Sequence, residues 1–428
     1  MKLLSADSMS RRWVWAILGL GLVIRVLYAG GLGESLWAGD ALGYLFQADQ
    51  ILSGEAFFPY WPPGLPYYLA IWKGLFGESF WGITAWMLTW YVGFHFLLQK
   101  AFSLTPLAQR LFLQRAALLL FALFPAFVHH SVAPLTHLPV AVLLLAAWVG
   151  WKKGWSPWLL GLMLGLMLLI RPASSMVIPV LGWIAWREKS YLWRQSFLGL
   201  MCLLLPLALW QTHTYRMNGY WLNINHANSY NLWLGNHPAS PHYKNWWLGS
   251  HADQDLDRFG RLYHQRLSIE SMPASMQESA YRISTWEHIR LQPGIFMLRV
   301  SNRGRVFFAF DTFTGARLIN AGHALGWLLL LLDAMCYGLL SVWALKGGVF
   351  GPKKRVRPYL WLITAYAFPY LLAFSHPSYH LAVLPFFLLL GAEGPINSDP
   401  EVWTDRRLLI GLLMWGLIQL EWIYHMLP

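Results

Sequence analysis

Charged residues are scarce in this chain. Asp, Glu, Lys and Arg make up 12% of the 428 residues, against roughly 25% in an ordinary soluble domain, and the mean hydropathy is +0.40. A soluble fold cannot bury that much apolar surface, and inside a bilayer a helix satisfies its own backbone hydrogen bonds. The composition therefore predicts an all-α, polytopic integral membrane protein.

Cysteine is almost absent, and internal repeats are missing. Cys202 and Cys336 both lie inside apolar runs, which excludes a disulfide framework and a thiolate metal site. The formal charge of +12 is concentrated in blocks such as GPKKRVRP beside apolar runs. Such blocks are typical of cytoplasmic loop ends that contact anionic membrane lipids, and they give no reason to expect nucleic acid as a partner.

Long apolar runs recur along the chain. A spanning helix needs about 20 mostly apolar residues, and Lys-rich and Arg-rich loops tend to remain in the cytoplasm. These two rules place the amino terminus in the cytoplasm. They predict about eleven spanning helices, at residues 13–30, 80–98, 116–130, 138–150, 158–170, 176–186, 197–213, 323–345, 359–374, 379–390 and 408–425.

Two hydrophilic segments are left on the outer side of this path. Residues 32–79 form a first outer loop, long enough for two short interfacial helices, and residues 214–320 form a larger loop or subdomain. We therefore divide the chain into an N-terminal transmembrane module (1–213), the large outer loop (214–320) and C-terminal transmembrane helices (321–428).

The first outer loop carries the most suggestive pair of residues. Asp40 and Tyr44 are one helical turn apart and would share a helix face. Asp40 follows Gly39 at the start of a helix-forming stretch, so it is either a helix N-cap or a functional carboxylate. The run YWPPGLP behind them cannot be regular helix and returns the chain to the membrane.

Several motifs occur together in a fixed order. Asp40 is followed by ILSG, PPGLPYYLA and GLFG, then by LFPAFVHHS, IRPASSMVIP, NSYNLWLGNHP and YHLAVLPFFLLLGA. This ordered set resembles the GT-C membrane glycosyltransferases. The resemblance is greatest to the branch that contains dolichyl-phosphate-mannose protein mannosyltransferases and bacterial lipid A aminoarabinose transferases.

The resemblance implies transfer of a sugar from a polyprenyl-phosphate donor to a lipid, glycan or protein acceptor on the outer face, with Asp40 as the catalytic base. That role agrees with the chemistry, because a hydroxyl attacking an anomeric carbon must lose a proton and the oxocarbenium-like transition state gains from a nearby carboxylate. The lipid phosphate that leaves needs a cation. Arg171, at the outer end of an apolar run, is the candidate, and its alternative role is to reach lipid headgroups.

The remaining candidates come from the later motifs. Asn231, Trp233 and Asn236 match the large-loop motif and would shape a donor or acceptor pocket, unless they form only a structural turn. Tyr379 and His380 lie at the outer end of a late span and would bind the lipid phosphate, unless they are packing residues.

The sequence departs from the family pattern at three positions. Ala41, His137 and Ser378 replace an acidic residue, a glutamate and an arginine that relatives carry. The two lost carboxylates leave metal dependence open, because the sequence is compatible with a divalent metal but does not require one. His130 and His137 share a side, but we do not interpret them as a metal site.

Two other functions are compatible with the composition. A transporter or flippase of lipid-linked glycans would place ionisable residues at mid-bilayer, and here Asp333 is the main such residue. A non-catalytic scaffold subunit would tolerate the missing acidic residues. The absence of an N-x-Ser/Thr sequon and the bacterial likeness favour a bacterial inner membrane.

Overall fold

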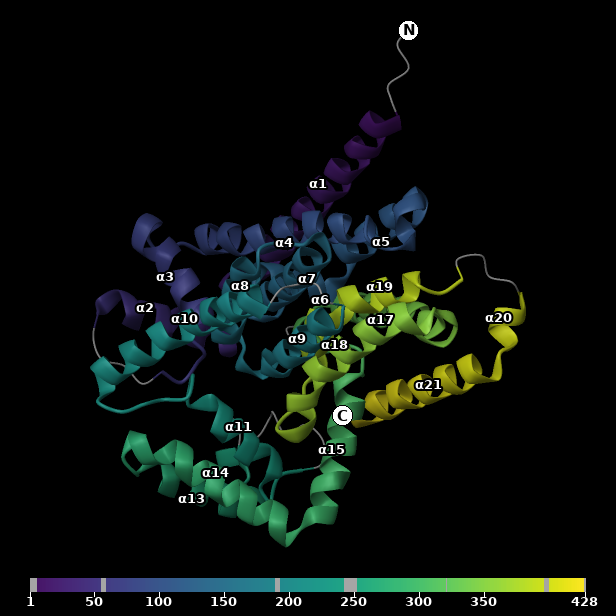
Figure 1. Ribbon diagram of the computed structural model, residues 1–428. Helices are drawn as coiled ribbons and strands as arrows, with labels where there is room; N and C mark the ends of the chain where they lie inside the picture. The colour runs from purple at the N-terminus through teal and green to yellow at the C-terminus, as the bar shows by residue number, and fades with distance from the viewer. Residues whose placement is uncertain are drawn as a thin grey trace.

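The computed structural model describes residues 6–54, 59–188, 193–241, 252–320, 322–395 and 400–426, and in these ranges the chain is helical with no strand (Figure 1). Within these ranges, four helices are long and apolar enough to cross a membrane. They are α1 (Ala6–Leu32), α10 (Trp193–Asn218), α17 (Leu325–Phe350) and α21 (Arg406–Met426). The expectation of an α-helical protein with membrane-type helices is confirmed.

The expectation of about eleven spanning helices is not supported by the described part of the chain. Several apolar runs form shorter helices, namely α5 (Leu111–Leu123), α6 (Pro125–Val132), α7 (His137–Lys153), α8 (Pro157–Ile170), α9 (Val177–Arg187) and α19 (Leu384–Ala392). α5 and α6 meet at an angle of 59° and count as a fifth span only if taken together. An average of hydropathy over a window of residues does not detect such breaks. Prolines at the starts of helices cause them, because proline interrupts the backbone hydrogen bonds of a continuous helix.

Two longer helices also fall outside the four. α4 (Phe80–Phe102) has 23 residues but is rich in Trp, Tyr and His, and α18 (Lys353–Leu372) begins with the basic run KKRVR. Both have the length of a span without its uniform apolarity.

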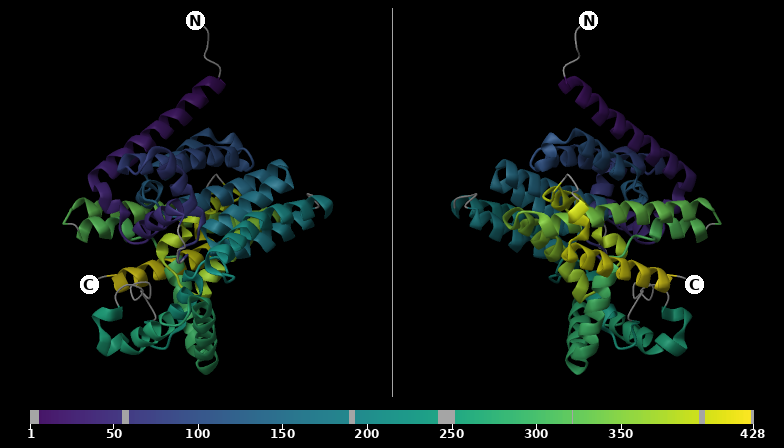
Figure 2. Two further views of the ribbon diagram at one scale, coloured as in Figure 1. Left: turned by 90° about the vertical axis from the view of Figure 1, so that its left-hand side faces the viewer. Right: turned by 90° about the vertical axis from the view of Figure 1, so that its right-hand side faces the viewer.

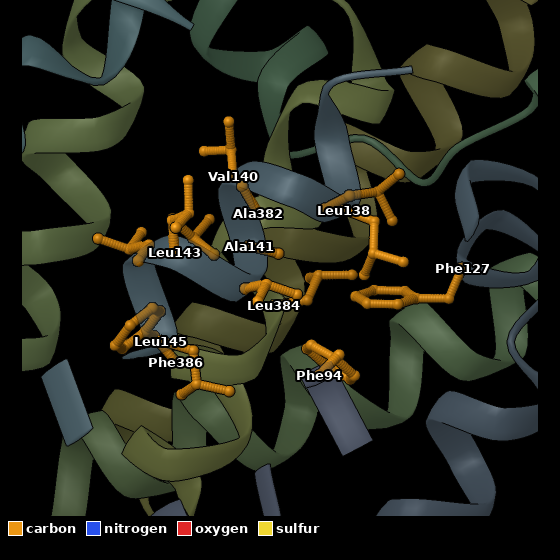
Figure 3. Close-up of a cluster of buried hydrophobic side chains, with 14 of the residues drawn as sticks. Phe94, Phe127, Leu138, Val140, Ala141, Leu143, Leu145, Ala382, Leu384 and Phe386 are labelled. Carbon is orange, nitrogen blue, oxygen red and sulfur yellow. The ribbon is translucent and has the colours of Figure 1, made fainter. Parts of the chain in front are cut away.

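The centre of the bundle is α7. Every residue from His137 to Trp151 in this helix is buried, and α7 contacts α4, α8 and the 3₁₀ segment η6 (Pro377–Val383). Figure 3 shows Leu138 and Ala141 of α7 facing Phe94, Phe127 and Leu384. Because α7 is apolar on all sides, it needs protein around it on all sides.

The break between α5 and α6 is held by two buried charges. Arg25 of α1 donates hydrogen bonds to the carbonyls of Ala122 (3.0 Å) and Phe121 (3.3 Å) at the end of α5, and to the Ser131 hydroxyl (2.7 Å). The Asp333 carboxylate of α17 accepts the Ala126 N–H (2.8 Å) at the start of α6. A cation at a helix C-terminus and an anion at an N-terminus satisfy the backbone groups that a broken span leaves unpaired.

The first outer loop folds as the segment η1 (Gly33–Trp37) and the helices α2 (Asp40–Ser53) and α3 (Gly64–Phe76). Lys73 of α3 is buried and pairs with Asp49 of α2 and, at 3.1 Å, with Glu78. This ion pair fixes α3 against α2, and the two helices pack along their length.

The large outer loop contains α11 (Ala227–Asn236), α13 (Leu256–Glu270), α14 (Ala274–Leu291), α15 (Pro293–Phe307) and α16 (Phe313–Asn320). Helices α11, α13 and α14 share a second hydrophobic core that includes Tyr230, Trp233 and Tyr281. Figure 2 shows α13, α14 and the start of α15 at the end of the molecule farthest from the amino terminus.

Candidate active site

The Asp40 carboxylate is presented by the start of α2. Gly39 adopts a φ of 65°, which favours glycine, and Asp40 is the first residue inside the helix. Its carboxylate caps no backbone N–H and makes no hydrogen bond to a described residue, so the N-cap interpretation is wrong. The side chain is exposed to solvent. A carboxylate left unused by its own helix is available for chemistry.

Arg171 lies between α8 and the segment η3 (Pro172–Met176). Its guanidinium carbon is 4.5 Å from the ring centre of Tyr379 and 5.7 Å from that of Tyr370. The Nη1 atom is buried and has no hydrogen-bond partner among the described residues. Arg171 therefore faces the protein, with a donor free to bind an anion.

Asp40, Tyr44 and Arg171 act on one another electrostatically. The protein packed around Asp40 raises the pKa of its carboxyl above the ordinary value, and the positive charge of Arg171 works in the opposite direction. Burial, followed by the nearby Asp40, raises the pKa of the Tyr44 hydroxyl. The exposed side chain of Asp40 and its raised pKa are compatible, because a group can touch solvent while protein surrounds it on most sides. Such a carboxyl suits acid–base work.

The other buried arginines have a different use. Arg299 donates to the backbone carbonyls of Asn236 (3.0 Å) and Ser240 (2.9 Å), and Arg303 donates to that of Leu372 (2.6 Å). Arg25 caps α5 in the same manner. The terminal nitrogens of these three guanidiniums are committed to carbonyls, whereas the guanidinium of Arg171 lies over the rings of Tyr370 and Tyr379. This difference makes Arg171 the candidate for an anion site.

The large-loop candidates are placed elsewhere. Trp233 is fully buried in the second core, and Asn231 is half-buried on the same helix. The Asn236 amide donates to the Leu372 carbonyl (3.0 Å) and its side-chain oxygen accepts from Arg303 (3.0 Å). No hydrogen bond or ring contact of these three reaches Asp40 or Arg171 within the described residues. Asn236 therefore lies in a joint between α11, α15 and the end of α18.

Tyr379 and His380 are neighbours in sequence but point to different surroundings. Tyr379 lies beside Arg171, whereas His380 is fully buried, is 2.8 Å from the Phe307 carbonyl through Nδ1, and stacks on Tyr337. His380 therefore belongs to the packing of the bundle, and of the two only Tyr379 is in position to act with Arg171.

A cluster of buried histidines lies next to this site. The rings of His130 and His137 are 4.2 Å apart, His137 stacks on Tyr379, and His130 Nε2 is 3.6 Å from an Asp311 carboxylate oxygen. Within the described ranges, no group of three or more His, Cys, Asp or Glu side chains could hold a metal ion.

Two further parts of the site were not identified from the sequence. Tyr366 and Tyr370 are one turn apart on α18, and the Tyr370 hydroxyl donates to that of Tyr366 at 3.3 Å. The i, i+4 spacing of two tyrosines in the apolar run AYAFPYLL was a detectable signal. Trp61, whose ring centre is 5.1 Å from that of Tyr44, lies in the proline-rich segment that was interpreted only as a turn.

Comparison with known proteins adds no assignment. The chain matches no protein-family model, no curated protein and no solved structure. The functional conclusion therefore depends on the residues and geometry described above.

Proposed function

We propose that this protein is an integral membrane glycosyltransferase that transfers a sugar from a polyprenyl-phosphate donor to a lipid, glycan or protein acceptor on the outer face of the membrane. The observation that supports this most is the electrostatic influence of Arg171 on an exposed carboxylate, Asp40, with neither that carboxylate nor Arg171 Nη1 hydrogen-bonded to any residue that the structure describes. The two groups supply the opposite charges that this reaction needs.

In the proposed reaction, Asp40 takes the proton from the acceptor group that attacks the anomeric carbon. The bond between the sugar and the phosphate oxygen breaks, and the polyprenyl phosphate leaves with both bonding electrons. Arg171 stabilises the charge that grows on the phosphate, and the rings of Tyr379 and Tyr370 both lie beside its guanidinium. The reaction requires no redox step.

The buried charges of the spans favour this function over transport. A transporter uses mid-bilayer ionisable groups to line a pathway. Arg25 was not identified from the sequence. Arg25 and Asp333 both form hydrogen bonds to backbone groups at the α5–α6 break. Their role in holding the helices explains why they are buried without invoking a pathway.

The proposal includes a GT-C-type bundle with the amino terminus in the cytoplasm of a bacterium and the loops of α2 and α11 to α15 outside. In such a bundle further crossings are made by helices less apolar than the four long ones. α4, at 23 residues, has a length of about 34 Å, which is sufficient for a crossing.

The test is transfer from polyprenyl-phosphate sugars by the purified protein in lipid vesicles. We expect Asp40→Asn to lower kcat at least 100-fold, the scale of a lost general base, and Arg171→Gln to lower kcat/KM. Glu34→Gln, a change to another exposed acid of the first outer loop, is the matched control and should be silent. Movement of the donor between leaflets without transfer, equally fast in Asp40→Asn, would favour a flippase instead.

A further inference from the structure

The segment Pro59 to Pro63 has no regular structure but is fixed from two sides. Gln47 of α2 donates to the Trp61 carbonyl and accepts the Trp61 N–H, both at 3.0 Å. From the large loop, Ala227 N–H (3.2 Å) and the Asn225 amide (2.9 Å) donate to the Tyr60 carbonyl. The prolines of the segment add fixed φ angles. A loop tied in this way holds its side chains in one place.

The Trp61 indole lies against α2 at Gly43, one turn after Asp40. A Cβ on Gly43 would come within 2.2 Å of the indole nitrogen, so only glycine permits this approach. The ring also contacts Tyr44 and Tyr60, with ring centres 5.1 and 5.0 Å away. Gly43 and Tyr44 follow Asp40 by three and four residues, which is one turn of α2. Trp61 is therefore a rigid ring next to the proposed base.

The other aromatic rings at the site are already occupied. Tyr44 and Tyr370 are buried, and Tyr370 and Tyr379 have the Arg171 guanidinium over their faces. Trp61 is half-buried, and no cation lies over its ring among the described residues. Part of the Trp61 ring is therefore accessible to a ligand.

A sugar ring has the chemistry that such a surface binds. One face of a pyranose consists of C–H groups and is apolar, while its hydroxyls point outward from the edge and remain hydrogen-bonded. An aromatic ring with part of its surface exposed packs against the C–H face, and a ring fixed in advance loses little entropy when it does so.

We infer that Trp61 packs against the sugar of the polyprenyl-phosphate donor and contributes to the choice of sugar. This inference depends on the proposed function, because it takes the phosphate to lie at Arg171 and the anomeric carbon to lie near Asp40. The sugar attached to that carbon would then lie against the Trp61 indole, which contacts α2 one helical turn after Asp40.

The experiment measures transfer from undecaprenyl-phosphate glucose, mannose and aminoarabinose in lipid vesicles by the wild type, Trp61→Ala and Trp61→Phe. We expect Trp61→Ala to raise the donor KM at least 10-fold, with a smaller change in kcat and no change in the acceptor KM. Trp61→Phe should restore part of the loss, and its effect should differ among the three sugars. Trp221→Ala removes another exposed indole, which stacks on Tyr215, and should leave the donor KM unchanged.

The outcomes separate the inference from the proposed function. If the wild type transfers sugar and Trp61→Ala, with the elution profile of the wild type, keeps its donor KM, the inference is overturned and the proposed function stands. A rise in the acceptor KM alone would also overturn it, because Trp61 would then contact the acceptor. If the wild type transfers none of the three sugars, the proposed function fails and the inference fails with it.

Discussion

At the scale of single residues, the charge of Asp40 is set by its surroundings. The protein around it raises the pKa of the carboxyl, and Arg171 counteracts that rise. A base must be deprotonated to act, so kcat/KM should fall with falling pH at a higher pH than an ordinary Asp, near 3.9, would give. In Arg171→Gln the opposing charge is gone, so the acid limb of the pH profile should move to still higher pH. A limb that moved to lower pH would contradict the proposed proximity.

The same pKa shift predicts the effect of Asp40→Asn on stability. Because the pKa of Asp40 is raised in the folded protein, the unfolded chain ionises this carboxyl more readily. Asp40 therefore stabilises the fold at low pH, and this contribution is lost as the pH rises through the folded-state pKa. At neutral pH, Asp40→Asn should therefore melt at the same temperature as the wild type or above it. A melting temperature several degrees lower would show that Asp40 has a structural role.

The pKa of Asp311, between α15 and α16, is shifted in the opposite direction. Burial alone would raise the pKa of this carboxyl, but the imidazole of His130, 3.6 Å away, and the N–H of Phe313 (2.8 Å) outweigh burial and hold the pKa at about 2. Its stabilisation is complete above the unfolded pKa and is lost as pH falls towards 2. Asp311→Asn should cost about 2 kcal/mol at pH 7, the value of charged hydrogen bonds, measured by thermal unfolding in detergent. The exposed Asp253→Asn should cost almost nothing, and equal losses in both would contradict this account.

At the scale of elements, the α5–α6 break depends on the two charges that cap it. Arg25→Met leaves the carbonyls of Phe121 and Ala122 and the Ser131 hydroxyl without this donor and should cost about 3 kcal/mol, at about 1 kcal/mol for each of the three lost hydrogen bonds. Asp333→Asn keeps an oxygen that can accept the Ala126 N–H and should cost less than Asp333→Leu. Arg12→Met removes an exposed arginine from the same α1 and is the control for unfolding in detergent. If all of these variants unfolded alike, the capping account would be wrong.

The joint between α11 and α18 depends on a glycine. A Cβ on Gly235 would lie 1.7 Å from the Ala373 carbonyl oxygen, so Gly235→Ala must push the two helices apart. The expected cost is about 2 kcal/mol, in the range of overpacked sites, again by unfolding in detergent. Gly182→Ala on α9 meets no atom within 4 Å and should be neutral or stabilising. A Gly235→Ala protein as stable as Gly182→Ala would show that this contact is loose.

At the scale of the whole molecule, the predictable features were those carried by local pattern. Composition predicted the helical class, and the spacing of Asp40 and Tyr44 predicted one helix face. The break at Phe124 was not predictable, because the residues that cap it are distant in the sequence. Arg25 is separated from Ser131 by 106 positions, and Asp333 is separated from Ala126 by 207 positions. Hydropathy contains no information on such contacts.

In the candidate site, too, some features follow from local sequence pattern and others depend on contacts between distant parts of the chain. Asp40, through the resemblance, and Arg171, as an arginine at a span end, were identifiable as candidates. Their grouping with Tyr370 was not, because α2, α8 and α18 come from distant parts of the chain. Asn236 matched a motif, but its hydrogen bonds to α18 and to Arg303 place it in a joint, away from Asp40.

The number of membrane crossings can be decided at α4. If α4 crosses, its two ends lie on opposite sides of the membrane, and the positive-inside rule puts Lys100 in the cytoplasm. In a protein with Cys202 and Cys336 replaced by alanine, Ser35→Cys and Ser271→Cys should react with a membrane-impermeant maleimide added outside spheroplasts. Ser103→Cys and Lys153→Cys, at equally exposed positions, should react only after lysis. Labelling of Ser103→Cys from outside would place both ends of α4 on one face of the membrane and remove that crossing from the bundle. The helices that follow α4, up to the next broken span, would then lie on the opposite side from the one assigned to them.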